Sequence, residues 1–184
     1  MHFAVHTRFR LASPGDDGAL ADFLSRLSPE TTRARYLASI RLEGQALRRE
    51  LARLLPADAA GHKVLIAEQD GIIRGFGEYV VADGQRADLA LVVEDRFQGY
   101  GLGRALFLNL EYLAVREGIR TFTGDVAPHN LRARQLLRSS GRVLRLVYAY
   151  ATICFELALN PAADTRPISL LYAMRRRASE PAAA

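Results

Sequence analysis

The chain has 184 residues, of which 49% are apolar and 24% charged, and this length and composition are typical of one soluble globular domain. Its single cysteine excludes an internal disulfide, the spacing of its cysteine and histidines excludes a zinc site, and no apolar run is long enough to span a bilayer. The formal net charge of +5 comes mostly from scattered arginines, so nucleic-acid binding is not expected. Residues 1–10 lack the apolar region of a signal peptide, so we expect a cytoplasmic protein that binds no metal and no membrane.

The N-terminal third is predicted to hold one short strand followed by helices. Residues 7–11 alternate between polar and apolar side chains, which is typical of a strand. A helix signal follows at Ser13-Pro14, with apolar residues at helical spacing up to Leu27. Ser28-Pro29 begins a second helix, and Leu42–Leu55 has a third helical pattern.

The middle of the chain changes to a strand pattern. Two apolar runs, His62–Gln69 and Ile72–Val81, are separated by Asp70-Gly71, which favours a hairpin turn. A further turn signal precedes Arg86–Val93. These segments predict three consecutive antiparallel strands.

The C-terminal half returns to alternating elements. Gly101–Glu117 is a long helix pattern, Ile119–Val126 is a strand and Pro128–Ser140 is a second helix. Val143–Leu157 is apolar and rich in β-branched and aromatic residues, so it predicts two paired strands with a bend near residues 149–152.

This order predicts an α+β (mixed α/β) fold with helices on both faces of one sheet, because strands and helices do not alternate regularly. We expect one domain over residues 1–159 and a partly mobile tail over residues 160–184, which contains three prolines. Residues 168–174 of this tail could dock as one turn or one strand.

The segment Gln98–Gly103 is a glycine-dense turn between a predicted strand and a predicted helix. Glycines let the backbone approach a ligand closely, and the first turn of a helix offers free N–H groups to a phosphate. The sequence lacks the P-loop and dinucleotide-binding motifs, which excludes those two nucleotide sites. Alone, the glycines are equally compatible with a tight connection that binds nothing.

The residues around this turn carry a family resemblance. Val93, Gln98, Gly101 and Gly103 resemble the acyl-CoA signature of the GNAT superfamily of N-acetyltransferases, and Asn130–Leu136 resembles its second motif. Over residues 5–158 the resemblance implies a GNAT-like central sheet, mostly antiparallel, of about seven strands. It also implies acetyl-CoA as the acyl donor and a primary amine as the acceptor.

The resemblance implies specific cofactor contacts. Backbone N–H groups of the loop would hold the pyrophosphate, the β-strand edge before it would bind the pantetheine arm, and Asn130 would anchor that arm. Arg104 and Arg134 would add positive charge near the phosphates, although solvent-facing roles fit them equally. The loop and strand residues implied are Leu91, Val92, Val93, Gln98, Gly99, Tyr100, Gly101, Leu102, Gly103 and Arg104.

Two carboxylates are candidates for the catalytic base, Asp88 and, second, Glu78. Either one needs a raised pKa or a water relay to take a proton near neutral pH. The position where the superfamily usually has a tyrosine acid is Leu137, so Tyr148 or solvent would protonate the thiolate. His62 is expected on the surface and Cys154 in the core.

A narrower resemblance concerns the acceptor. Leu27-Ser28-Pro29-Glu30-Thr31, followed by Arg35-Tyr36, resembles the N-terminal helix region of bacterial protein lysine acetyltransferases that modify acyl-CoA synthetases. A helix cap followed by a core tyrosine is the alternative interpretation. We therefore prefer a protein lysine as the acceptor. A small-molecule amine, or a non-catalytic acyl-CoA-binding module, remains the alternative, and a homodimer is left open.

Overall fold

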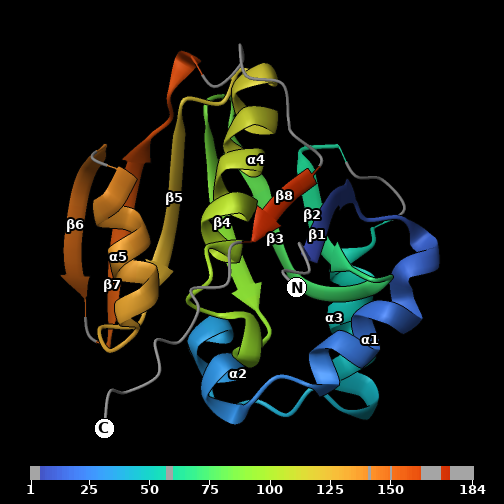
Figure 1. Cartoon of the computed structure of the whole chain (residues 1–184). Coiled ribbons are helices and arrows are strands. Elements are labelled where there is room, and N and C mark those ends of the chain that lie inside the picture. The colour runs from blue at the N-terminus through green and yellow to red at the C-terminus, as the bar shows by residue number, and fades with distance from the viewer. Residues whose placement is uncertain (1–4, 57–59, 141, 150, 163–170, 175–184) are drawn as a thin grey trace, which may run out of the picture.

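The computed structural model describes residues 5–56, 60–140, 142–149, 151–162 and 171–174. A single eight-stranded sheet, ordered β6-β7-β5-β4-β3-β2-β1-β8, forms its centre (Figure 1). The strands are β1 (Val5–Leu11), β2 (His62–Gln69), β3 (Ile72–Asp83), β4 (Arg86–Val93), β5 (Thr121–Val126), β6 (Val143–Ala149), β7 (Thr152–Ala158) and β8 (Leu171–Met174). The helices are α1 (Asp17–Ser25), α2 (Pro29–Tyr36), α3 (Gly44–Leu54), α4 (Leu102–Arg116) and α5 (Leu131–Ser140), with single 3₁₀ turns at Pro14–Asp16 and Asp95–Phe97.

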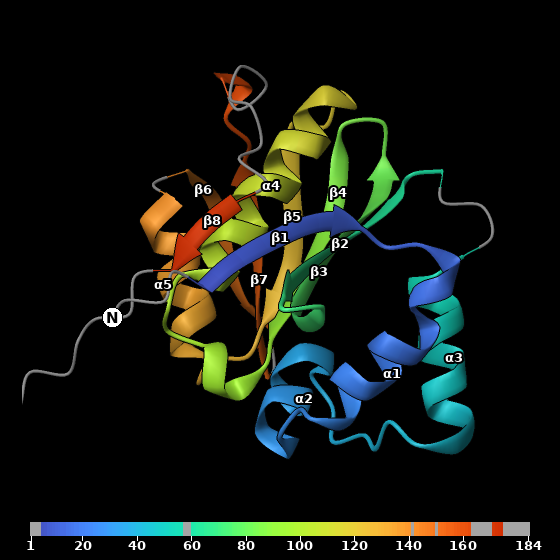
Figure 2. The ribbon, with the colours of Figure 1, turned by 45° about the vertical axis from the view of Figure 1, so that its right-hand side comes forward.

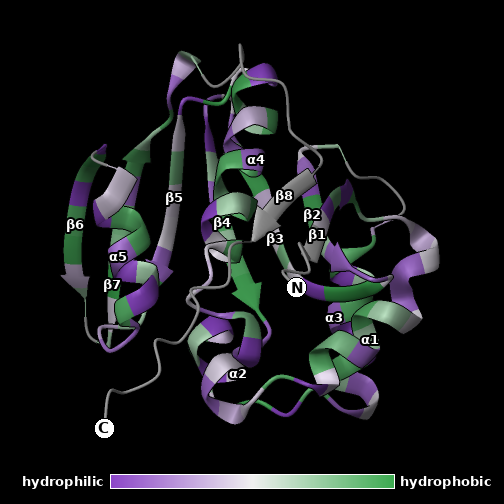
Figure 3. Ribbon diagram, viewed as in Figure 1, coloured by the Kyte–Doolittle hydropathy of each residue, from purple (hydrophilic) through white to green (hydrophobic). Residues whose placement is uncertain are grey.

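The helices cover both faces of the sheet and bury a separate apolar cluster on each. On one face α4 and Leu137 of α5 pack against residues that include Tyr79, Phe122 and Phe155. On the other, α1 and α3 pack against residues that include Ile66 and Phe76. Figure 3 shows the hydrophobic residues along the central strands. The predicted mixed α/β fold with helices on both faces is confirmed.

The eighth strand lies within the segment expected to be a tail. β8 pairs antiparallel with β1, from Val5 opposite Met174 to Arg8 opposite Leu171 (Figure 2). The alternative that this segment docks as a strand is therefore confirmed for Leu171–Met174, whereas residues 163–170 and 175–184 lie outside the described residues. The domain boundary after residue 159 stays a prediction. Among the residues described, no helix combines the length and apolar character needed to cross a bilayer.

Strands β4 and β5 form a fork that shapes the site. They are the only parallel neighbours among the described strand pairs, and their pairing covers Arg86–Asp88 with Thr121–Thr123 and then stops. At the branch, a Cβ on Gly124 would lie 2.9 Å from the carbonyl oxygen of Leu89, so only glycine permits this close approach. Beyond it, no described strand pairs with this edge of Leu89–Val93.

Candidate active site

The loop that follows β4 places a bare helix end beside the fork. Gly99 and Gly101 have φ angles of +83° and +90°, a conformation that glycine adopts without the steric cost of a side chain. Gly101 is the N-cap residue of α4, and no side chain of the described residues caps it. The first N–H groups of α4 therefore point out of the helix without internal partners, as an anion site requires.

The side chain of Gln98 ties this loop to three elements. Its Nε2 donates hydrogen bonds to the Val93 carbonyl oxygen at 2.9 Å and to Thr31 Oγ1 of α2 at 3.0 Å. Its Oε1 accepts a hydrogen bond from Arg132 of α5 at 3.0 Å. Because the side-chain amide of Gln98 is hydrogen-bonded within the protein, we expect Gln98 to contact the cofactor through its backbone N–H.

Buried Glu94 anchors the start of the same loop. Its carboxylate pairs with Arg96 at 2.6 Å, Arg74 at 3.1 Å and Arg26 at 3.3 Å. Burial acts to raise the pKa of Glu94, but the arginines outweigh it and hold the pKa below its ordinary value. Arg74 also lies over the Phe97 ring, 4.6 Å from its centroid, and so packs against the turn.

A cavity of about 240 Å³ lies on the face of the sheet that α2 and α3 cover. The β3–β4 register sets Glu78 opposite Ala90 and Val80 opposite Asp88, so both candidate carboxylates point to this face. Sequence parity alone could not decide this orientation. The cavity is lined by Arg35, Tyr36, Arg53, Glu78, Val80, Asp88, Leu89 and Ala90.

Glu78 is the buried floor of this cavity, with 3% of its side chain exposed. Its carboxylate accepts hydrogen bonds from Arg53 at 2.8 Å and Arg35, and it contacts His62 Nε2 at 2.7 Å. Burial acts to raise the pKa of Glu78, but His62, Arg53 and Arg35 lower it to about 2. The pKa of Glu78 is thus lowered rather than raised, so a role for Glu78 as the base would depend on the water relay.

Asp88 has a different environment at the rim of the cavity. Its side chain is exposed, and the Thr123 hydroxyl donates a hydrogen bond to its carboxylate across the fork. The next residue, Leu89, begins the unpaired edge of β4. Asp88 is therefore the accessible carboxylate at the point where cavity and fork meet.

The chain matches the sequence model of the Acetyltransferase (GNAT) family over residues 27–141, which is more than half of its length. The protein belongs to the GNAT family of acetyltransferases. An acetyltransferase from Pseudomonas aeruginosa is 31% identical over 127 residues, covering 66% of this chain and 66% of that protein, slightly less than two thirds. The predicted donor, acetyl-CoA, is confirmed at the level of the family.

Solved GNAT structures share the fold. The GNAT domain of S. lividans PAT is 24% identical, with a TM-score of 0.74 over 83% of this chain and 90% of that one. yncA from Salmonella typhimurium, solved with its cofactor acetyl-CoA, is 20% identical, with a TM-score of 0.65 over 84% of this chain and 94% of that one.

The strand edge expected to hold pantetheine in this GNAT protein pairs with no described strand from Leu89 to Val93, although the Val93 carbonyl already accepts a hydrogen bond from Gln98. Val92 is buried against α1 and α3, whereas Leu91 and Val93 pack toward α4 on the opposite face. Their side chains are fixed by the two apolar clusters, so only backbone groups face the fork. This arrangement fits an extended ligand that binds as an added strand.

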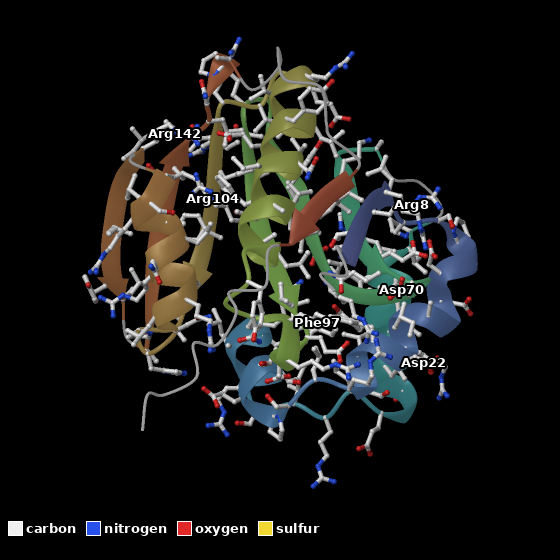
Figure 4. The ribbon with its side chains drawn as sticks, in the orientation of Figure 1. Arg8, Asp22, Asp70, Phe97, Arg104 and Arg142 are labelled. Carbon is white, nitrogen blue, oxygen red and sulfur yellow. The ribbon has the colours of Figure 1, made fainter. Side chains whose placement is uncertain are left out.

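Other residues predicted at the cofactor site mostly hold the protein itself together. Asn130 Oδ1 caps α5 by accepting a hydrogen bond from the Ala133 N–H at 3.0 Å, and Arg134 donates to the Pro128 carbonyl at 2.8 Å. Arg104 is exposed and donates to Ser139 Oγ at 3.3 Å (Figure 4).

The side chains of the loop residues differ in exposure and in the space around them. Gly103 has open space, because a Cβ there would meet only the Val93 side chain at 3.9 Å. Leu102 is buried at 1% exposure and anchors α4, whereas Tyr100 is 48% exposed. Direct cofactor contacts of these residues stay predictions.

The positions considered for the acid and for the thiol differ in how exposed they are. Leu137 of α5 is buried in the core, and Tyr148 is 69% exposed on the edge strand β6. Cys154 is half-buried on the opposite face of β7 from core residue Phe155, so its expected core position is wrong. Hydrogen bonding with Asp125 raises the pKa of this thiol.

Sequence reasoning missed the cluster around Glu78. His62, expected on the surface, has only 12% of its side chain exposed and contacts this carboxylate. Tyr36 donates a hydrogen bond to Glu50 at 2.9 Å, and burial raises the pKa of its hydroxyl. The one available signal was the Arg35-Tyr36 pair at the end of α2, because its partners lie far away in the sequence.

Proposed function

We propose that this GNAT enzyme transfers an acetyl group from acetyl-CoA to a primary amine, preferably the side chain of a protein lysine. The observation that carries the proposal is the course of β4. The strand leads from Asp88 at the rim of the cavity, along the unpaired edge of the fork, to the glycine loop. Donor and acceptor would therefore meet along one strand.

The chemistry follows from this arrangement. The pyrophosphate would bind the N–H groups at Gln98–Arg104, and the pantetheine arm would pair with Leu91–Val93. The Val93 N–H would lie near the thioester oxygen and stabilise the charge that develops there. Asp88, directly or through a water molecule, would take a proton from the ammonium before the amine attacks the thioester carbon.

Departure of the thiolate completes the transfer. As the carbon–sulfur bond breaks, the nitrogen that has attacked loses its second proton to water, and the CoA thiolate needs one proton. Leu137 provides none, and Tyr148 lies on β6, which β7 and β5 separate from β4. We assign this proton to solvent.

A protein lysine is preferred for two reasons. The cavity of about 240 Å³ is smaller than the roughly 300–1,000 Å³ typical of small-molecule pockets, so it suits one aliphatic amine arm with the rest of the acceptor outside. The residues Leu27–Thr31 and Arg35-Tyr36 also resemble those of protein lysine acetyltransferases. The same volume admits a short free amine, which is the second candidate.

Isotope-labelled acetyl-CoA tests the acceptor. The enzyme would be incubated with lysine-containing peptides, with matched peptides in which arginine replaces lysine, and with a mixture of small amines. Mass spectrometry is expected to find label on lysine side chains alone. Label only on small amines would favour the second candidate, and no label on any acceptor would contradict the enzymatic proposal.

A further inference from the structure

The sequence motif at the start of α2 contacts the donor loop directly. Asp95, in the 3₁₀ turn after β4, accepts hydrogen bonds from the Ser28 N–H at 3.0 Å, the Ser28 hydroxyl at 2.6 Å and the Thr31 hydroxyl at 2.7 Å. Figures 1 and 2 both show α2 below the end of β4 where this turn begins. One carboxylate thus joins two segments more than sixty residues apart in the sequence.

These bonds exceed what a helix cap needs. The Ser28 hydroxyl oxygen already accepts from the Thr31 N–H at 3.1 Å, which is an ordinary N-cap interaction. Thr31 Oγ1 also accepts from Gln98 Nε2 at 3.0 Å while it donates to Asp95. The Thr31 hydroxyl therefore bridges Asp95 and Gln98, on the two sides of Arg96-Phe97.

The opposite end of α2 forms part of the acceptor cavity. Arg35 pairs with buried Glu78 on β3, and Tyr36 binds Glu50 on α3. Both Arg35 and Tyr36 line the cavity. The helix has 8 residues, about 12 Å in length, so a displacement of its first turn reaches its last turn as a rigid-body shift.

We propose that Asp95 is a positioning residue that couples occupancy of the donor loop to the placement of the acceptor wall. A pyrophosphate bound at the loop fixes the loop backbone, and with it Asp95 and Gln98. These two residues then hold Thr31 and the first turn of α2, and the last turn presents Arg35 and Tyr36 to the amine. The inference rests on the proposed function in taking this loop as the donor site and the cavity as the acceptor site.

Hydrogen exchange measured by mass spectrometry tests the coupling without a known acceptor. The probe is CoA alone, and calorimetry measures its affinity for each variant. In the wild type, CoA is expected to slow exchange of the α2 amides about tenfold, within the range usual for coupled sites. Asp95→Ala and Thr31→Val should abolish this slowing, and because coupling is reciprocal they should bind CoA up to about tenfold more weakly.

Two further variants complete the design. Asp95→Asn keeps an oxygen acceptor without the charge, so it should restore part of the effect. Glu30→Gln changes an exposed carboxylate in the same helix and should leave the effect intact. Thermal unfolding of each variant separates coupling from a general loss of stability.

The outcomes distinguish this inference from the proposed function. If CoA does not bind the wild type, the donor site itself is wrong. If CoA binds but α2 exchange does not slow, the coupling is wrong. The coupling is also wrong if exchange slows as much in Asp95→Ala and Thr31→Val as in the wild type, and Asp95 then only holds the start of α2 in place.

Discussion

Asp88 and Glu78 point to the same face of the sheet, yet their surroundings prepare them for different tasks. Glu78 is enclosed by Arg35, Arg53 and His62, which keep it ionised. Asp88 is exposed and has a hydroxyl partner, Thr123. A group that must alternately take and release a proton cannot be the more strongly ion-paired one. We therefore propose Asp88 for proton transfer and a structural role for Glu78.

Replacing Asp88 with asparagine should lower kcat by about 10²- to 10⁴-fold, the usual contribution of a general base. CoA affinity should remain, because the loop and the edge of β4 are unchanged. The pH–rate profile should lose its ascending limb. Asp83→Asn, which changes an exposed acid at the end of β3, is the matched control. A larger effect on the profile from Glu78→Gln than from Asp88→Asn would exchange the two roles.

Replacing Glu78 with glutamine should instead lower the free energy of unfolding by about 3 kcal/mol, because it leaves Arg35, whose side chain is only 10% exposed, without its charged partner. The folded pKa of about 2 lies below the ordinary 4.5, so the stabilisation is present above pH 4.5 and is lost as pH falls toward 2. Denaturant unfolding at neutral and acidic pH measures this. The stability gap between wild type and variant should narrow on acidification, and a constant gap would disprove the assignment.

At the scale of elements, the loop and α4 form one unit, and the glycines at the two ends of α4 have different roles. Gly101 begins α4 and Gly118 follows its end, and both have positive φ angles. A valine at either position adds similar backbone strain, about 1–2 kcal/mol. Only the substitution at Gly101 also blocks the helix end proposed to bind phosphate.

Gly101→Val should therefore weaken CoA binding at least tenfold, about 1.4 kcal/mol or more, whereas Gly118→Val should leave it unchanged. Calorimetry with CoA measures both, and circular dichroism confirms that both variants fold. Equal CoA affinities for the two variants would refute the location of the donor site.

The fork between β4 and β5 is the other functional element. Parallel pairing ends after Asp88 and Thr123, which leaves the edge of Leu89–Val93 to an added strand. An unpaired interior edge of this kind normally recruits another chain or a ligand. In this protein the edge lies between the loop and the cavity, and we propose that the pantetheine arm of acetyl-CoA binds along it.

At the scale of the whole molecule, local patterns predicted most of the fold. Period changes located the central hairpins and α4, and the glycine spacing located the loop, because these signals lie within a few residues of each other. The facing of Asp88 and Glu78 was not predictable, since a one-residue change of register would reverse it. The β3–β4 register decides it.

Contacts between distant residues account for the remaining differences. Glu78 gathers Arg35, Arg53 and His62, which lie 43, 25 and 16 residues away in the sequence, and no local pattern joins them. β8 pairs with β1 although its own sequence resembles a tail. Asn130 and Gln98 carried a family signal, but their side-chain bonds to α5 and α2 emerge only in three dimensions.

Release of free CoA from acetyl-CoA is the most direct test of the central claim that donor and amine meet along β4. Purified wild-type enzyme would be assayed with a thiol reagent across lysine peptides and small amines. The proposed function predicts amine-dependent thiol release, which Asp88→Asn strongly reduces and Gly101→Val reduces at least about tenfold at low acetyl-CoA concentration. Tight CoA binding by the wild type, with no thiol release for any amine, would contradict it.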